Sequence, residues 1–245
     1  MNSIGSFRQK ASVIFQQFGL APFRKILTSP DIERVANESG CSPQRGRVLV
    51  PEAVVWLMVG VALKTSSMTQ GLSLAWGWIC TACFWLKGPC ITEEAFCQAR
   101  QRLSLIFWRK LWDCLRFKYI QRFDAQMRWK GLRPIAVDGS EVDVPNVPAL
   151  VKFFTRPRTQ RGDSKSPQGR LVAACSVFTG FCLDFVFISR RFSEHLALKH
   201  LMRYFQENDL ILLDRGFFFL RRHSCDSRAQ GTLSHASNGT NRRPR

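Results

Sequence analysis

The spacing of apolar residues along the chain changes character near residue 130. Before that point apolar residues occur in long runs or at intervals of three and four, which is typical of helices. After it, short apolar runs alternate with turn-forming residues, which is typical of strands. The sequence therefore predicts an α+β chain, with a helical N-terminal domain over residues 1–130 followed by an α/β domain over residues 131–220.

Four segments of the helical part carry clear signals. Residues 53–63 are apolar throughout and residues 65–86 contain no charged side chain, so both predict buried helices. Thr92 precedes two glutamates, a pattern typical of a capped helix start. A longer helix is predicted around residues 108–119, because apolar residues at three-to-four spacing form one face: Trp108, Leu111, Trp112, Leu115 and Tyr119. Arg102, Arg109 and Arg116 are seven residues apart and are predicted to line another face.

The α/β part reads as three strands, a helix and a further strand. The strands are predicted at residues 134–138, 170–178, 181–189 and 209–213, and the helix at residues 193–205. Thr179 and Gly180 separate the second and third strands and indicate a hairpin. A hairpin combined with a helical crossover predicts a mixed sheet.

The last 25 residues differ from the rest of the chain. They contain six arginines, one acid and none of Ile, Val, Phe, Trp, Tyr or Met. Such a composition cannot bury a core, so residues 221–245 are predicted to form a disordered basic tail.

The charge balance indicates a polyanionic partner. The chain carries 36 Lys and Arg against 18 Asp and Glu, for a net charge of +18, and a bound polyanion would relieve the self-repulsion. DNA, RNA and an anionic membrane surface all remain open on this ground. A small basic membrane protein built on residues 53–86 is the weakest alternative, because residues 65–73 include several polar side chains. Between residues 100 and 133 there are ten basic residues and two acids, which favours phosphate contact.

The nine cysteines form no clear metal or disulfide pattern. They are odd in number and scattered, and the start of the chain has no long apolar stretch, so a reducing cytoplasm is the expected setting. Cys80 and Cys83, with Cys90 and Cys97, have spacing compatible with zinc. Their apolar surroundings favour buried thiols instead.

Two aspartates end apolar runs and are closely followed by glycine. Asp138 lies in IAVDGS and Asp214 in LILLDRG. On adjacent strands of one sheet, the two carboxylates would be close enough to share a divalent cation, which suits phosphodiester chemistry. The alternative is that both aspartates only cap turns.

Several segments, in order along the chain, resemble the insertion-sequence family 4 transposases. These are RGRVLVPEAVVWLMVGVAL and TEEAFCQARQRL in the helical part, then VDGSEVDVPN, SPQGRLVAA, SEHLALKHL and DLILLDRGFF. The resemblance covers roughly residues 15–218. It implies a DDE enzyme with a ribonuclease H-like core, whose substrates are DNA ends and target DNA rather than a small molecule. Asp138 would be the first catalytic acid and Asp214 the second, both binding Mg²⁺ or Mn²⁺, and a second copy of the chain is a candidate partner.

The family's third acid has no counterpart here. It is a glutamate in a Tyr-x2-Arg-x3-Glu-x6-Lys pattern, whereas this sequence has no glutamate after Glu207. The expectation is therefore an incomplete ribonuclease H-like core, truncated at its C-terminus by a frameshift or early stop, and catalytically inactive. The alternative function is a non-catalytic DNA-binding competitor of the intact enzyme. Basic residues between Thr155 and Arg170 are predicted to contact the DNA backbone: Arg156, Arg158, Arg161, Lys165 and Arg170.

Overall fold

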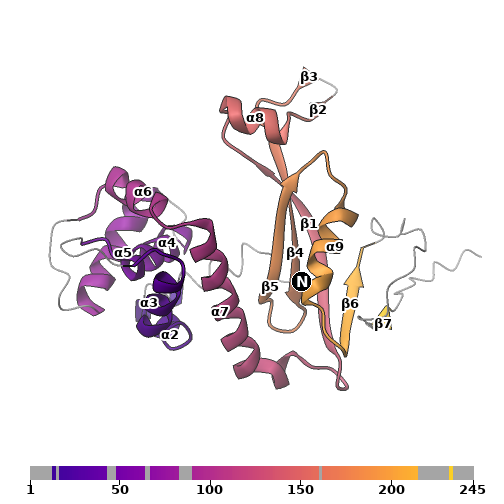
Figure 1. Ribbon diagram of the computed structural model, residues 1–245, viewed down its shortest axis with the longest axis horizontal. Helices are drawn as coiled ribbons and strands as arrows, with labels where there is room; N and C mark the ends of the chain where they lie inside the picture. Colours follow the sequence, from indigo (N-terminus) through magenta and orange to yellow (C-terminus); the bar gives the residue numbers. More distant parts are fainter. Residues whose placement is uncertain are drawn as a thin grey trace, which may run out of the picture. The chain divides into compact units, whose positions relative to one another are not determined.

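The structure is a computed structural model that describes residues 13–14, 17–42, 48–63, 67–82, 90–159, 162–214 and 232–233. It divides into two compact units, Met1–Arg122 and Phe123–Arg245 (Figure 1). Within the described ranges the first unit is helical, and the second combines helices with a mixed sheet. The predicted α+β class is confirmed.

The first unit contains the helices predicted from its apolar runs. Its helices are α2 (Ala21–Arg24), α3 (Ser29–Glu38), α4 (Pro51–Leu63), α5 (Met68–Ala82), α6 (Glu93–Gln101) and α7 (Leu105–Phe123). The Thr92 hydroxyl accepts a hydrogen bond from the backbone N–H of Ala95, so the predicted cap of α6 is confirmed. No helix in the part of the chain that the structure describes is long and apolar enough to cross a membrane.

Helices α4 and α5 pack closely against each other in the core of this unit. Leu57 of α4 and Leu72 of α5 are fully buried. A Cβ added to Gly60 would lie only 2.3 Å from the Cβ of Ala75, so the two helices approach most closely where residue 60 has no side chain. On α7, Leu111 of the predicted apolar face is buried, and Phe107, outside that face, is fully buried as well.

The second unit is built on a five-stranded sheet. Its elements are the 3-10 helix η1 (Asp124–Met127), β1 (Arg133–Asp143), α8 (Pro148–Phe154), β2 (Arg158–Thr159), β3 (Gly162–Asp163), β4 (Gln168–Ser176), β5 (Cys182–Ser189), α9 (Glu194–Leu201), the 3-10 helix η2 (Met202–Tyr204), β6 (Asp209–Leu213) and β7 (Thr232–Leu233). The strand order is β5-β4-β1-β6-β7. Strands β1, β4 and β5 are antiparallel neighbours, whereas β6 and β7 add in parallel. The predicted hairpin and mixed sheet are confirmed.

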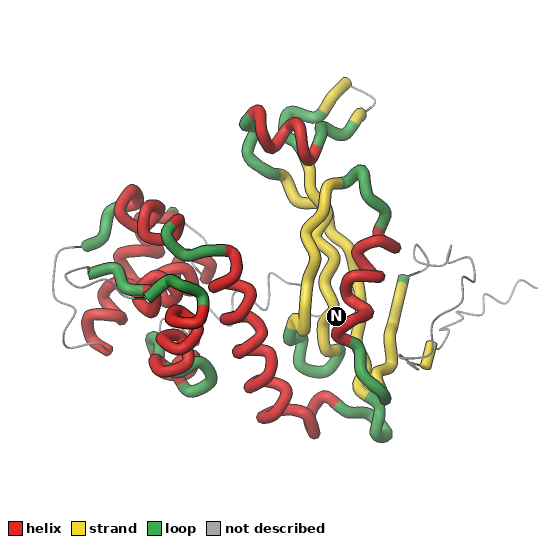
Figure 2. Tube along the Cα trace, in the orientation of Figure 1, coloured by secondary structure: helices red, strands yellow, loops and turns green. Residues whose placement is uncertain are grey.

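Helix α9 packs on one face of β4 and β5 (Figure 2). Its residues Ala197, Leu198 and Leu201 are buried there. The helix was predicted at residues 193–205 and is observed at Glu194–Leu201. The 3-10 helix η2 follows it in place of the last predicted turn. Helix α9 is the crossover that makes β6 parallel to β1.

Three features differ from the sequence prediction. Strand β1 runs to Asp143 instead of ending at residue 138, because β4 pairs with it as far as Asp143↔Gln168. The segment between β1 and β4 is not a plain loop, since it contains α8 and the two-stranded β2–β3 pair. Inside the predicted disordered tail, Thr232–Leu233 pairs with Leu210 and Ile211 of β6, because β6 offers free backbone groups along its outer side.

Candidate functional site

The two aspartates singled out by the sequence lie at neighbouring positions where β6 ends beside β1. Strands β1 and β6 are parallel neighbours, and their last described pair is Val137↔Leu213. Asp138 is the next residue of β1 and Asp214 directly follows β6, and both are exposed. Parallel neighbours lie about 4.8 Å apart, so the backbones of the two aspartates lie side by side.

Asp138 faces away from α9. Side chains alternate between the two faces of a strand, and Ile135 and Val137 lie on the buried face of β1. A Cβ on Gly139 would lie 3.1 Å from an Oε1 of Glu194, so Gly139 also lies on the α9 side. Asp138 therefore projects from the opposite face, where its Oδ1 accepts a hydrogen bond of 2.7 Å from the backbone N–H of Gly139.

The donor set fits a hard divalent cation. Mg²⁺ prefers oxygen ligands and is commonly held by one or two carboxylates together with substrate phosphates. Asp138 and Asp214 supply two carboxylates that are open to solvent. Among the described residues no group of three or more His, Cys, Asp or Glu is arranged to hold a metal ion. The candidate site therefore consists of two carboxylates, those of Asp138 and Asp214.

An ion-pair cluster occupies the other face of the same strands. The Arg170 guanidinium lies 3.5 Å from carboxylate oxygens of both Glu141 and Glu194, and Arg190 Nε lies 2.9 Å from Glu141 Oε1. Arg170, predicted as the first residue of a strand and as a DNA contact, is therefore part of β4 on the α9 face. The carboxylates of Glu141 and Glu194 balance the charge of Arg170. Glu141 lies directly opposite Arg170 on the neighbouring strand β1.

The arginine stripe predicted on one helix is interrupted. Arg102 is the C-cap of α6, and the next helix begins at Leu105, where the Ser104 hydroxyl accepts a hydrogen bond from the backbone N–H of Phe107. A serine at this position favours a helix start over helix continuation, so Arg102 lies off the helix of Arg109 and Arg116. The prediction that the three arginines share one helix face was therefore wrong for Arg102.

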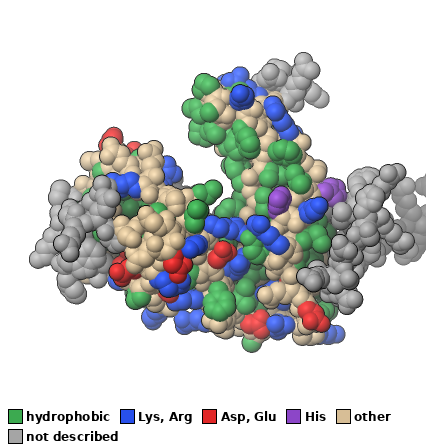
Figure 3. All heavy atoms as spheres, in the orientation of Figure 1, with side chains coloured by type: hydrophobic (Ala, Val, Ile, Leu, Met, Phe, Trp, Pro, Cys, Tyr) green, Lys and Arg blue, Asp and Glu red, His purple; other side chains and the backbone are tan. Residues whose placement is uncertain are grey.

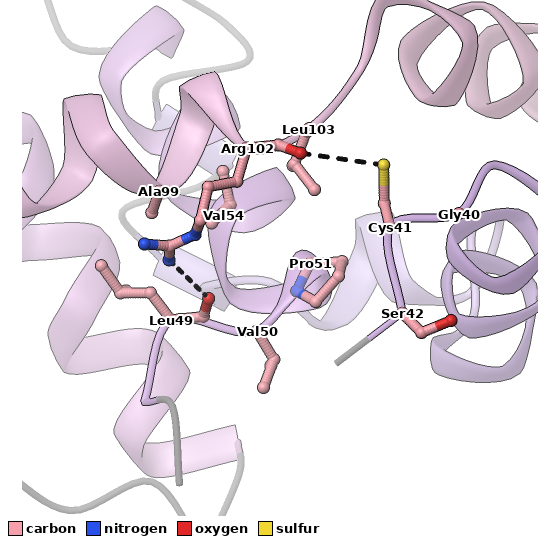
Figure 4. Close-up of a pocket in the computed structure, with 10 residues that line it drawn as sticks. All are labelled: Gly40, Cys41, Ser42, Leu49, Val50, Pro51, Val54, Ala99, Arg102 and Leu103. Atoms are coloured by element: carbon pink, nitrogen blue, oxygen red, sulfur yellow. Dashed lines mark hydrogen bonds between the residues drawn. The ribbon is translucent and has the colours of Figure 1, made fainter. Parts of the chain in front are cut away.

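Arg102 instead lines a small pocket in the first unit. Figure 4 shows its side chain extending toward the backbone carbonyl of Leu49, to which Nη2 donates a hydrogen bond of 3.5 Å. The Cys41 thiol lies 3.8 Å from the carbonyl oxygen of Arg102 on the opposite side. The pocket holds about 100 Å³, which is small for an organic ligand. It supports no binding role of its own.

Arg109 and Arg116 both approach Asp113 on α7. The distances are 4.0 Å from Arg109 Nε to Oδ2 and 2.9 Å from Arg116 Nη2 to Oδ1. One acid between two arginines leaves this stretch of helix positively charged. It therefore stays a candidate phosphate contact.

The segment between β1 and β4 gathers several exposed cations. Arg156, Lys152 and Lys165 are exposed, and Arg156 donates a hydrogen bond of 2.8 Å to the Asn146 side chain. Arg156 and Lys152 line an open groove of about 520 Å³ beside α8, and Figure 3 shows basic side chains over this segment. Arg158 belongs to β2, while Arg161 lies outside the described residues.

The described cysteines are free thiols. Cys175 and Cys182 are neighbours across β4 and β5, and their mutual hydrogen bond, together with burial, raises the pKa of Cys182. Burial also raises the pKa of Cys80. Cys83, its partner in the weighed zinc pattern, lies outside the described residues.

Comparison with known proteins identifies relatives of both units. Residues 19–113 match the family described as insertion element 4 transposase N-terminal. Over 194 residues the chain is 26% identical to the transposase InsG for insertion sequence element IS4 of Escherichia coli (strain K12). That alignment covers 77% of this chain and 42% of the relative, so the chain spans less than half of the relative's length. No solved structure matches the chain.

Proposed function

We propose that this chain, which is similar to insertion element 4 transposases over residues 19–113 and at 26% identity over 194 residues, is a transposase of that family that binds DNA and carries two metal-binding acids of a phosphodiester-cleaving core. The observation that carries the proposal is the alignment of Asp138, within β1, with Asp214, which directly follows the neighbouring parallel strand β6. Two acids that only cap turns would have no reason to lie at neighbouring positions.

We further propose that the second unit is a ribonuclease H-like core. The support is its topology, in which three antiparallel strands are followed by a helical crossover and a strand parallel to the first. The family resemblance of VDGSEVDVPN and DLILLDRGFF calls for this arrangement, with the first two acids on the first and fourth strands.

In this proposal Asp138 and Asp214 hold Mg²⁺ or Mn²⁺ between them. Metal ions bound there would supply the two roles of two-metal chemistry, in which one ion activates the attacking oxygen of a phosphodiester cleavage and the other stabilises the leaving oxygen. Asp138 lies within β1 and Asp214 directly follows β6, and both strands bury inward side chains such as Val137 and Ile211, so the backbones of the two acids are rigidly placed. Two like charges on adjacent strands repel each other, which favours uptake of a divalent cation.

The basic segments would bind the DNA backbone. Lys152, Arg156 and Lys165 are exposed in the unit that carries the two acids. Arg109 and Arg116 would add contacts from α7. Because phosphate binding by Lys and Arg releases counterions, the affinity should fall steeply with salt.

A second candidate is DNA binding without cleavage. The 245 residues contain two of the three acids that the family resemblance calls for, since no glutamate follows Glu207. Two-metal catalysis depends on charge and geometry together, so these 245 residues by themselves would bind DNA through their basic side chains without cutting it.

Manganese titration tests the metal site directly. We expect the full chain to bind Mn²⁺ in calorimetry, and Asp138→Asn or Asp214→Asn to weaken binding by more than about tenfold, since even the outer partners of metal ligands contribute that much. Asp143→Asn is the matched control, because Asp143 is also an exposed acid of β1 but lies beside Gln168, 2.9 Å from its amide. Equal Mn²⁺ affinity of Asp138→Asn and Asp143→Asn would contradict the proposed site.

A gel-shift and nicking assay separates the two candidate functions. Salt-sensitive DNA binding without product in Mg²⁺ supports the non-catalytic form. Nicking that disappears in Asp138→Asn would show that these residues suffice for catalysis.

A further inference from the structure

A buried ion pair joins the opposite ends of the two strands that carry the acids. Arg133 begins β1 and Asp209 begins β6, and their side chains are 4% and 2% exposed. Arg133 Nε donates to Asp209 Oδ1 at 2.7 Å, and Nη2 donates to Oδ2 at 2.8 Å. This is the two-pronged arginine–carboxylate geometry, which is directional as well as strong.

The same carboxylate also fixes the turn that leads into β6. The backbone N–H of Gln206 donates to Asp209 Oδ2 at 2.8 Å. The backbone N–H of Arg133 donates to the carbonyl of Asn208 at 2.8 Å. The pair therefore connects the start of β1 to the turn before β6 through several hydrogen bonds.

The remainder of the two strands specifies their register weakly. Between the ion pair and the acids, β1 contributes Pro-Ile-Ala-Val and β6 contributes Leu-Ile-Leu-Leu. Near-continuous apolar runs are typical of parallel strands, and a slip by two residues returns apolar side chains to the same face. A slip would, however, leave Arg133 and Asp209 buried without each other, which costs several kcal/mol.

We propose that Arg133 and Asp209 are positioning residues that set the register of β1 on β6 and thereby hold Asp138 and Asp214 side by side. Asp138 is the fifth residue after Arg133, and Asp214 is the fifth after Asp209. Because Arg133↔Asp209 is itself a register pair, equal spacing on both strands brings the two acids level. The link to metal binding rests on the proposed function, whereas the register itself does not.

The effect of a slip on the metal site follows from strand geometry. A two-residue slip moves one acid by about 6.6 Å along the sheet. Metal–oxygen distances in a magnesium site are about 2.1 Å, so two carboxylates displaced by that amount cannot share one ion. Register and metal affinity should therefore change together.

The test removes both charges of the pair at once in the full chain. Arg133→Met with Asp209→Leu replaces the pair by apolar side chains, a change that is often tolerated in stability. Through-hydrogen-bond NMR couplings between β1 and β6 report the register, and calorimetric titration reports Mn²⁺ affinity. We expect the folded double variant to show more than one set of β1–β6 couplings and Mn²⁺ binding weaker by about tenfold or more.

A single native register with unchanged couplings in the double variant would overturn the proposal. If the double variant does not fold, the same NMR couplings are measured in Arg133→Lys. Lysine keeps the positive charge but cannot donate two parallel hydrogen bonds to Asp209. We then expect additional β1–β6 couplings in Arg133→Lys, and a purely native set would again overturn the proposal. If the unaltered chain binds no Mn²⁺, the proposed function fails, while the couplings still decide whether the pair sets the register.

Discussion

Replacing Gly60 by alanine tests the close approach of α4 and α5. The added Cβ would lie 2.3 Å from the Cβ of Ala75 and 3.4 Å from its Cα. Carbon atoms in contact are ordinarily about 3.5–4.0 Å apart, so the helices must separate by roughly 1 Å or more. Gly77→Ala on α5 is the matched control, because a Cβ at Gly77 meets nothing within 4 Å.

Both substitutions gain the higher helix propensity of alanine, but only Gly60→Ala also forces a methyl group into a packed core. Glycine to alanine within a helix stabilises by about 1 kcal/mol in both cases. Forcing an extra methyl into a packed core costs about 1–3 kcal/mol, and this applies at Gly60 alone. We therefore expect Gly77→Ala to stabilise the chain, and Gly60→Ala to be less stable than Gly77→Ala by about 1–3 kcal/mol.

Urea unfolding followed by tryptophan fluorescence measures this difference. Trp56 and Trp76 are buried in the same core, so the signal reports the helices concerned. The free energy of unfolding should fall with urea concentration at the same slope in both variants, so the difference in their unfolding midpoints measures the difference in stability. Equal midpoints for Gly60→Ala and Gly77→Ala would refute the close packing of α4 on α5.

Three further predictions concern charge. Burial alone raises the pKa of Asp31, but hydrogen bonds from Lys118 and Thr28 outweigh it and hold that pKa below 3.8. The stabilisation is thus present above pH 3.8 and lost as the pH falls through the lowered value, so Asp31→Asn should be less stable than the unaltered chain at pH 7, with a gap that closes in acid unfolding curves. Arg156→Ala should reduce the salt slope of DNA binding by about 1 in gel shifts at several salt concentrations. Arg170→Gln should leave the slope unchanged, because Arg170 is held by the carboxylates of Glu141 and Glu194 and by the carbonyl of Phe192. Manganese at 100 times its dissociation constant should stabilise the chain by about 2.7 kcal/mol, and a similar stabilisation of Asp138→Asn would count against metal binding at that residue.

Elements defined by local pattern were predictable from the sequence. The strand at residues 209–213 was placed at its observed bounds because an apolar run there is followed by charge and glycine. The hairpin was found from Thr179 and Gly180, and α6 from its Thr92 cap. The adjacency of Asp138 and Asp214 was also expected, since each acid ends an apolar run of the sequence.

Features that depend on distant partners were not predictable in this way. The full length of β1 is set by pairing with β4 and not by its own polar second half, residues 139–143. The cluster around Arg170 joins Glu141 and Glu194, which are distant in sequence. Arg133 and Asp209 are polar in sequence but buried in the fold, and only their pairing makes that burial tolerable. The spacing of apolar residues within one segment does not show which distant residues will pair in the fold.

The peptide between Asp138 and Gly139 separates two very different surroundings. The aspartate projects into solvent, while the glycine leaves room for the carboxylate of Glu194 on the covered side. A bulkier residue at position 139 would either push that carboxylate off Arg170 or tilt the backbone and swing the aspartate with it. The face of the sheet under α9 and the face exposed to solvent are therefore coupled at residues 138 and 139. A change in packing beneath α9 would alter the direction in which the Asp138 side chain projects.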